Sequence, residues 1–132
     1  MIQKNGKIKM KLTIAYGVPA SGKTVLLKSL KGNYYDFDTP EKRFHVKDFI
    51  KEMKDKEYVL DSMIFNPNEF IEYVHKLHPT CFITIYVLNT DRNICLTRDD
   101  ERLRSRKSYK LIKNMKLKEI IPKNNLKIIE VI

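Results

Sequence analysis

Long apolar runs, cysteine clusters and internal repeats are all missing from this chain of 132 residues, and each absence excludes a class of protein. No stretch approaches the roughly 20 apolar residues that a transmembrane helix needs, so we expect no membrane partner. The N-terminal segment carries lysines but lacks the apolar region of a secretory signal, which favours a cytoplasmic location. Cys81 and Cys95 stand outside any metal-ligand spacing and are typical of reduced thiols.

What the chain does contain is enough for one soluble globular domain. Hydrophobic residues make up 42% of the sequence and charged residues 32%, and a chain of this length has room for a single core. We therefore expect residues 1–132 to form one domain, in which residues 1–9 are an extension before the first strand.

Positive charge dominates the composition, but most of it says little about function. The formal net charge is +10, and lysines outnumber arginines by 20 to 6 in a chain that is also rich in asparagine and isoleucine. An AT-rich genome produces that mixture through codon usage alone. The arginines are more informative, because four of the six lie within nine residues: Arg98, Arg102, Arg104 and Arg106.

Residues 17–24, GVPASGKT, match the pattern G-x-x-x-x-G-K-[ST] at every fixed position. Leu12–Tyr16 before them is an apolar run of strand length, and the apolar residues after them have helical spacing. Between a strand and a helix, the backbone N–H groups of such a loop turn inward around a phosphate. The helix also directs the positive end of its dipole at this anion. A chance glycine-rich turn is the alternative.

The motif predicts ATP and Mg²⁺ as cofactors. Lys23 would reach the β- and γ-phosphates, and the hydroxyl of Thr24 would bind Mg²⁺. We expect the nucleotide to be held by eight residues of the loop and of the following helix: Gly17, Pro19, Ala20, Ser21, Gly22, Lys23, Thr24 and Val25.

Strand and helix patterns alternate along the rest of the chain. Further strands are predicted at 34–37, 58–61, 81–88 and 126–132, and helices at 46–53, after Asn66-Pro67, after Asn89-Thr90-Asp91 and around 109–115. Phe70, Val74 and Leu77 are expected to face the core. This alternation predicts an α/β fold, a three-layer P-loop NTPase sandwich with a five-stranded parallel sheet and helices on both faces. Ligands of such sheets bind at the carboxyl ends of the strands.

Carboxylates follow two of the predicted strands. Asp61 ends an apolar strand, where a charge needs a partner, and Mg²⁺ is the nearest candidate. Asp36 and Asp38 follow the second strand, and Asp38 is our candidate for the base that accepts the proton of an attacking hydroxyl. The alternative is a pair of turn-forming aspartates beside Thr39-Pro40.

Arg98 and Arg102 are four residues apart and would share one face of a helix. Two guanidinium groups directed at a triphosphate could neutralise the charge that develops on the transferred phosphoryl group. Ion pairs with the acidic residues 99–101 are the alternative. The position after the fourth strand, where small P-loop kinases carry a closing lid, favours the catalytic interpretation.

These features together resemble the 5′-kinase domain of the bacteriophage-type polynucleotide kinases, within the P-loop kinase superfamily. The likeness extends from about Leu12 to Met115 and depends on Gly17–Thr24 with Pro19, on Asp61-Ser62 leading to Asn66-Pro67, and on Arg98-x-x-x-Arg102. It implies an ATP-dependent kinase that transfers the γ-phosphate to a hydroxyl, with the 5′-OH of DNA or RNA as the first candidate acceptor. It also implies that Asp61 or Ser62 takes the second acidic position and that Arg98 and Arg102 act from a lid.

The sequence departs from that family at three places. Ala20 stands where the family usually has glycine, and the spacing from Asp61 to Asn66 is one residue longer than in the family. The aspartate pair after the second strand is replaced by Asp36-Phe37-Asp38, in a shortened segment that also contains Glu41. Asp36, Asp38 and Glu41 are therefore all candidate bases. A kinase of nucleosides or other small metabolites and a non-catalytic nucleotide-binding module remain the alternative functions.

Overall fold

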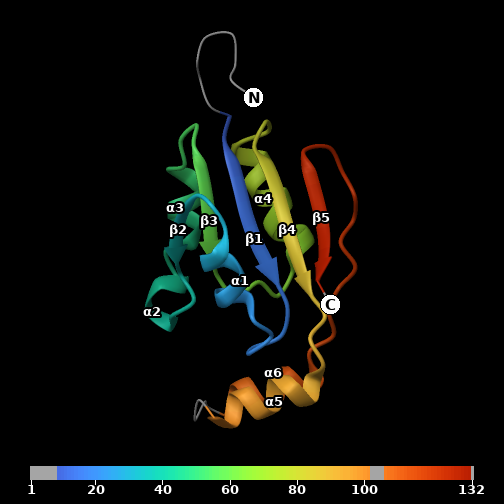
Figure 1. Cartoon of the computed structure of the whole chain (residues 1–132). Coiled ribbons are helices and arrows are strands. Elements are labelled where there is room, and N and C mark those ends of the chain that lie inside the picture. Colours follow the sequence, from blue (N-terminus) through green and yellow to red (C-terminus); the bar gives the residue numbers. More distant parts are fainter. Residues whose placement is uncertain (1–8, 102–105, 132) are drawn as a thin grey trace.

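The computed structural model describes residues 9–101 and 106–131. Within these ranges the elements follow in the order β1 (Lys11–Tyr16), α1 (Lys23–Ser29), β2 (Asn33–Asp36), α2 (Pro40–Arg43), α3 (Val46–Lys51), β3 (Glu57–Asp61), α4 (Pro67–Leu77), β4 (Phe82–Leu88), α5 (Arg92–Glu101), α6 (Arg106–Asn114) and β5 (Leu126–Val131). The alternation of strands and helices agrees with the predicted α/β fold (Figure 1).

The five strands of the described chain form one parallel sheet in the order β2-β3-β1-β4-β5. This confirms the predicted five-stranded parallel sheet. Because parallel strands end at the same edge, the loops that follow β1, β2, β3 and β4 all leave the sheet at its lower edge in Figure 1. β1 is central, so the glycine loop that follows it lies between the carboxyl ends of β3 and β4.

Helices cover both faces of the sheet, which completes the three predicted layers. On one face α3 and α4 enclose the larger core, whose fully buried members include Leu12, Ile14, Ile50 and Ile71. Burial of apolar area of this kind is the main favourable term in folding. This core therefore holds the sheet rigid behind the loops at its carboxyl edge.

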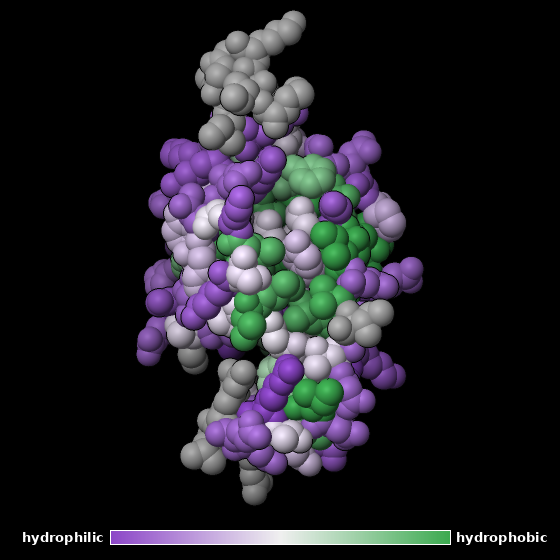
Figure 2. All heavy atoms as spheres, in the orientation of Figure 1, coloured by the Kyte–Doolittle hydropathy of each residue, from purple (hydrophilic) through white to green (hydrophobic). Residues whose placement is uncertain are grey.

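A smaller core lies on the other face, under α1. Leu27 of this helix is buried with Ala15, Val59 and Leu88 of three neighbouring strands. Beside α1 apolar side chains gather across the middle of this face, where Figure 2 shows them between hydrophilic margins. The helix that follows the glycine loop is thus anchored to β1, β3 and β4 by its own side chain.

The helices α5 and α6 pack against one another beyond the carboxyl edge of the sheet (Figure 1). A third apolar cluster joins them to the glycine loop, with Val18 and Ala20 from the loop, Cys95 from α5 and Ile112 from α6. All four of these residues are buried. The pair of helices is therefore packed directly onto the glycine loop, in the position predicted for a lid.

Two helix starts agree with the sequence. Asn66 caps α4, since its Oδ1 accepts a hydrogen bond from the N–H of Glu69 at 3.2 Å, and Pro67 takes the first helical position. At the start of α5, Asp91 Oδ1 accepts from two N–H groups of the first turn. Both caps lie at the carboxyl edge, where they set the direction in which each helix leaves the sheet.

One local expectation was wrong. Leu77 is 38% exposed, while Ile71 is 2% exposed, because the core-facing stripe of α4 runs through Pro67, Ile71 and Val74. The short helix α2 was not predicted; Thr39 Oγ1 caps it by accepting a hydrogen bond from the N–H of Lys42 at 3.3 Å.

Both cysteines are free thiols, as the sequence indicated, and both are buried. Burial raises the pKa of the Cys81 thiol to about 12 and raises that of Cys95 as well, so neither is an activated nucleophile. In the part of the chain that the structure describes, none of the helices has both the length and the apolar character needed to cross a bilayer.

Candidate active site

The glycine loop, residues 17–24, connects β1 to α1 and needs glycine at two positions for different reasons. A Cβ atom on Gly17 would lie 2.7 Å from Ser21 Oγ and 3.1 Å from the backbone oxygen of Leu88, so only glycine fits against the neighbouring strand end. Gly22 has a φ of 103°, a left-handed conformation, and is the N-cap of α1. The two fixed glycines of the motif therefore have direct structural causes.

Ala20 also adopts a left-handed conformation, with a φ of 62°. This is the position where the resembling family usually has glycine, and a non-glycine residue there carries backbone strain. Two side chains from the lid side hold the loop in this conformation. Arg98 Nη1 donates to the Ala20 oxygen at 3.1 Å, and Thr90 Oγ1 donates to the Ser21 oxygen at 2.6 Å.

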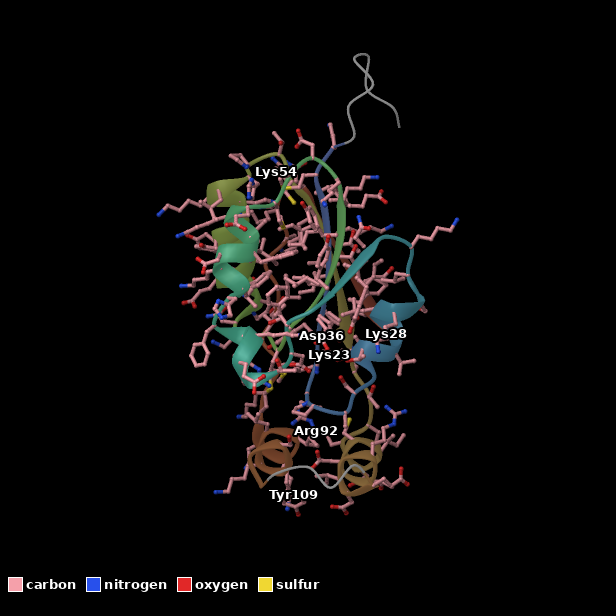
Figure 3. All side chains as sticks on the ribbon, turned by 90° about the vertical axis from the view of Figure 1, so that its left-hand side faces the viewer. Lys23, Lys28, Asp36, Lys54, Arg92 and Tyr109 are labelled. Carbon is pink, nitrogen blue, oxygen red and sulfur yellow. The ribbon has the colours of Figure 1, made fainter. Side chains whose placement is uncertain are left out.

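Lys23 lies under the loop, where its side chain is only 6% exposed. Its ammonium group donates to the backbone oxygens of Gly17 at 3.0 Å and Val18 at 2.9 Å. A buried ammonium needs such acceptors, and here the glycine loop itself supplies them. Figure 3 shows Lys23 at the carboxyl edge of the sheet, above Arg92 of α5. The lysine is thus placed beside the loop that would hold a phosphate.

Thr24 and Asp61, the two predicted metal ligands, are brought together by the ends of α1 and β3. The Thr24 hydroxyl donates to Asp61 Oδ2 at 2.7 Å, and the Asp61 side chain is 1% exposed. Among the described residues, Asp61 Oδ1 has no hydrogen-bond partner. A buried carboxylate oxygen without a donor suits a cation, so these residues fit Mg²⁺.

The remaining ligands of such an ion come from elsewhere. In the described ranges no three His, Cys, Asp or Glu side chains gather into a metal site. Mg²⁺ bound beside a nucleotide needs only one or two protein groups, because phosphate oxygens and water complete its shell. An ion held by Thr24 and Asp61 would therefore complete its coordination shell with oxygen ligands from a bound molecule or from water.

Tyr34 of β2 joins this pair, a contact that was not predicted from the sequence. Its hydroxyl donates to Asp61 Oδ2 at 2.6 Å. Burial is the main reason that the pKa of Tyr34 is raised far above its usual value of 10, and the hydrogen bond to Asp61 raises it further. The hydroxyl therefore keeps its proton and stays a donor. The available signal was the alternation of β2, which places Tyr34 and Tyr35 on opposite faces of the sheet.

Asp36 ends β2 beside Asp61, which ends β3. Asp36 pairs in register with Asp61, and the N–H of Phe37 donates to the backbone oxygen of Asp61 at 2.7 Å. Asp36 Oδ1 accepts from the N–H of Asp38 at 2.9 Å, which is a turn-forming contact. The turn interpretation is therefore correct for Asp36, and a catalytic role for Asp38 stays a prediction.

A basic residue pairs with the predicted base. Arg43 Nη2 lies 3.6 Å from Asp38 Oδ1 and 3.5 Å from the backbone oxygen of Asp38. Both groups are partly exposed, so the pair contributes little to stability. Its effect is positional, because it holds Asp38 toward α2. Glu41, the third candidate base, lies exposed in the first turn of α2.

Of the two predicted lid arginines, the structure describes one. Arg98 lies in α5, and its guanidinium contacts the loop, with Nη1 3.7 Å from the point where a Cβ of Gly22 would stand. Its hydrogen bond to the Ala20 oxygen shows that Arg98 reaches the glycine loop, and its catalytic role stays a prediction. Arg102 lies outside the described residues, as do Arg104 and the side chain of Arg106.

A cavity of about 490 Å³ opens next to these carboxylates, between α3 and α4. Its lining combines an apolar floor with aromatic, cationic and polar side chains: Arg43, Val46, Lys47, Ile50, Ser62, Met63, Ile64, Phe65, Asn66, Glu69, Phe70 and Tyr73. Arg43 connects it to Asp38, and Ser62 directly follows Asp61. The cavity therefore adjoins both the predicted base and the predicted metal site.

The fold and this site define an α/β protein of the P-loop sandwich class. No known family model matches the sequence, and neither does any curated protein. Among solved structures, a protein from Chloroflexus aurantiacus J-10-fl named as a "putative kinase" has a similar fold, with a TM-score of 0.63 over 92% of this chain and 88% of that chain. The two sequences are 13% identical, so the likeness concerns the fold.

Proposed function

We propose that this protein is an ATP- and Mg²⁺-dependent kinase that phosphorylates a hydroxyl group. The observation that carries the proposal is the contact between Thr24 of the glycine loop and the buried carboxylate of Asp61, whose second oxygen has no hydrogen-bond partner among the described residues. If the loop were only a turn, nothing would explain why a buried carboxylate oxygen beside it lacks a hydrogen-bond donor among the described residues. The similarity of the fold to a protein named as a kinase agrees with this function.

The residues of the site have separate tasks in this reaction. The loop holds the β- and γ-phosphates, and Lys23 exchanges its two backbone acceptors for phosphate oxygens. Thr24 and Asp61 hold Mg²⁺, which supplies charge neutralisation when bound. Arg98, which already contacts the loop, is available to the charge that develops on the γ-phosphoryl group.

Transfer then needs one proton acceptor. As the acceptor oxygen forms its bond to the γ-phosphorus, the bond from that phosphorus to the β,γ-bridging oxygen breaks, and ADP leaves. The acceptor hydroxyl gives its proton to the carboxylate of Asp38. Arg43 bonds to the backbone oxygen of Asp38 and contacts its carboxylate, so it limits where the base can move.

The best candidate for the acceptor is the 5′-OH of a DNA or RNA strand. Support comes from the resemblance of the motifs and from the lining of the adjoining cavity. Phe65 lines it while 47% exposed, and Phe44, next to Arg43 in the chain, is 85% exposed. The Lys47 ammonium lies 5.4 Å from the centre of the Tyr73 ring. Exposed aromatic faces beside cations are the means by which proteins hold single-stranded bases and phosphates.

The size of the cavity favours a second candidate. About 490 Å³ lies within the range of ordinary small-molecule sites, so a nucleoside or another small hydroxyl compound would also fit. The two acceptors differ in charge, because an oligonucleotide carries phosphates that a nucleoside lacks. This difference provides the test.

The experiment incubates the protein with γ-labelled ATP and either 5′-OH oligonucleotides or nucleosides at several salt concentrations. We expect label on the oligonucleotide, with its KM rising with salt more steeply than the KM of ATP. Each phosphate contact to a single strand contributes a slope of roughly −0.7 in log K against log salt, so two or three contacts give about −1.4 to −2.1.

Other results would change the assignment. Equal salt responses with a nucleoside labelled as well as an oligonucleotide would favour the small-molecule kinase. ATP binding without transfer to any acceptor would leave the non-catalytic nucleotide-binding module.

A further inference from the structure

The two oxygens of the Asp61 carboxylate have different surroundings. Oδ2 accepts two short hydrogen bonds, from Thr24 Oγ1 at 2.7 Å and from Tyr34 at 2.6 Å. Oδ1 is buried and has no hydrogen-bond partner in residues 9–101 and 106–131. Two donors on one oxygen fix the rotation of the carboxylate about its own axis and leave the other oxygen for a different kind of partner.

Thr24 cannot set this rotation alone. Its hydroxyl is also a proposed Mg²⁺ ligand, so the orientation of this hydroxyl depends on the bound ion. Tyr34 has no such second task, and its ring is held independently. The ring packs with the small core under α1, and the ammonium of Lys28 lies 5.6 Å from its centre.

The strand that carries Tyr34 is fastened to Asp61 at a second point. Tyr34 pairs in register with Val59 of β3, and the N–H of Phe37 donates to the backbone oxygen of Asp61. One hydrogen bond holds the side chain of Asp61 and the other holds its backbone. Tyr34 of β2 and Phe37 just after it, both before Asp38 in the chain, therefore hold the metal-binding residue through its side chain and its backbone.

We propose that Tyr34 is a positioning residue of the metal site, whose hydroxyl holds Asp61 Oδ2 so that Oδ1 is presented to the divalent cation. This inference rests on the proposed function. In this arrangement a residue of β2 sets the orientation of a carboxylate on β3. A carboxylate held rigidly in this way suits Mg²⁺, which demands near-ideal octahedral geometry, better than Ca²⁺, whose coordination is flexible.

The test compares Tyr34→Phe with the parent protein and with Tyr35→Phe as the matched control. Tyr35 is the neighbour on the opposite face, where its ring lies 4.9 Å from that of Phe49. The readout is Mn²⁺ binding to the protein–ADP complex, measured by electron paramagnetic resonance, with Mg²⁺ and Ca²⁺ as competitors. ADP binding in EDTA shows whether the phosphate loop is intact, and circular dichroism shows whether the variants fold.

We expect Tyr34→Phe to weaken Mn²⁺ binding by about tenfold to a hundredfold, the range found when an outer-shell partner of a metal ligand is removed. Ca²⁺ should lose less affinity than Mg²⁺, and ADP binding in EDTA should stay unchanged. Tyr35→Phe should bind Mn²⁺ like the parent.

An Mn²⁺ affinity of Tyr34→Phe within twofold of the parent would overturn the inference, and so would equal losses for Mg²⁺ and Ca²⁺. Failure of the proposed function looks different. A parent protein that binds Mn²⁺–ADP tightly but phosphorylates nothing leaves the role of Tyr34 standing, whereas a parent that binds no Mn²⁺ with ADP removes both.

Discussion

Gly17→Ala tests whether the glycine loop is packed as tightly as its geometry indicates. The new methyl group would lie 2.7 Å from Ser21 Oγ, 3.1 Å from the Leu88 oxygen and 3.3 Å from Leu88 Cβ. Carbon atoms prefer about 3.5–4.0 Å from their neighbours. Ser21 can move only by rotating a short side chain that is itself buried, and the Leu88 oxygen belongs to the end of β4. The contact therefore has to be relieved by displacement of the loop.

The magnitude follows from overpacking of a close-packed site, which costs about 1–3 kcal/mol. With a urea m-value of about 1–3 kcal/mol per molar for a small domain, the denaturation midpoint should fall by about 1 M. Ser21→Ala alone should be neutral or slightly stabilising, because Ser21 Oγ is buried and has no hydrogen-bond partner among the described residues. In the double variant the shortest contact disappears, while the 3.1 Å contact with Leu88 stays.

The assay is a double-mutant cycle of urea denaturation curves, with Gly32→Ala as a control. Gly32 has a φ of 128°, so alanine there is strained by its own backbone, and Ser21→Ala should not rescue it. For Gly17→Ala we expect Ser21→Ala to recover at least half of the lost free energy of unfolding. Additive effects in the cycle, or a Gly17→Ala variant as stable as the parent, would refute the packing argument.

Two further predictions concern the charged residues of the loop and lid. Arg98→Ala should lower kcat by at least about tenfold while changing the Kd for ATP little, because the guanidinium acts on charge that develops during transfer; steady-state kinetics decides, and an unchanged kcat would contradict the assignment. Lys23→Ala should abolish transfer and weaken ATP binding. It should also lower the free energy of unfolding by about 1–3 kcal/mol, because the Gly17 and Val18 oxygens lose their donor. Calorimetry with and without ATP measures ATP binding and stability, and a variant that binds ATP like the parent would exclude the role of Lys23.

Much of the fold and half of the site could be predicted because the relevant signals are local. The motif at residues 17–24 defines its own strand, loop and helix. Asp61 could be recognised because a charge at the end of an apolar strand stands out in the sequence, and parallel strand ends meet at one edge. The contact of Thr24 with Asp61 depends in addition on the adjacency of β1 and β3, which the structure shows.

Contacts that depend on the order of the strands could not be predicted in the same way. The alternation of Tyr34 and Tyr35 shows that they face opposite ways, but not that β2 lies beside β3 or which face carries α1. The same holds for the pair between Arg43 and Asp38, because the short helix α2 gives too few residues for any periodic pattern. Both contacts become visible only when the register is known.

Ala20 shows how a departure from a motif can be compensated at a distance. Alanine at a φ of 62° costs about 1–2 kcal/mol in conformational energy, yet the loop keeps this conformation. The hydrogen bonds from Arg98 and Thr90 reach the backbone oxygens of Ala20 itself and of the next residue, Ser21, and the methyl group of Ala20 packs with Cys95 of α5 and Ile112 of α6. With glycine at this position, a displacement of α5 would carry no such losses. Here a displacement of α5 would remove the contacts that hold Ala20 in place, so the conformation of the glycine loop and the position of α5 are energetically coupled through this one residue.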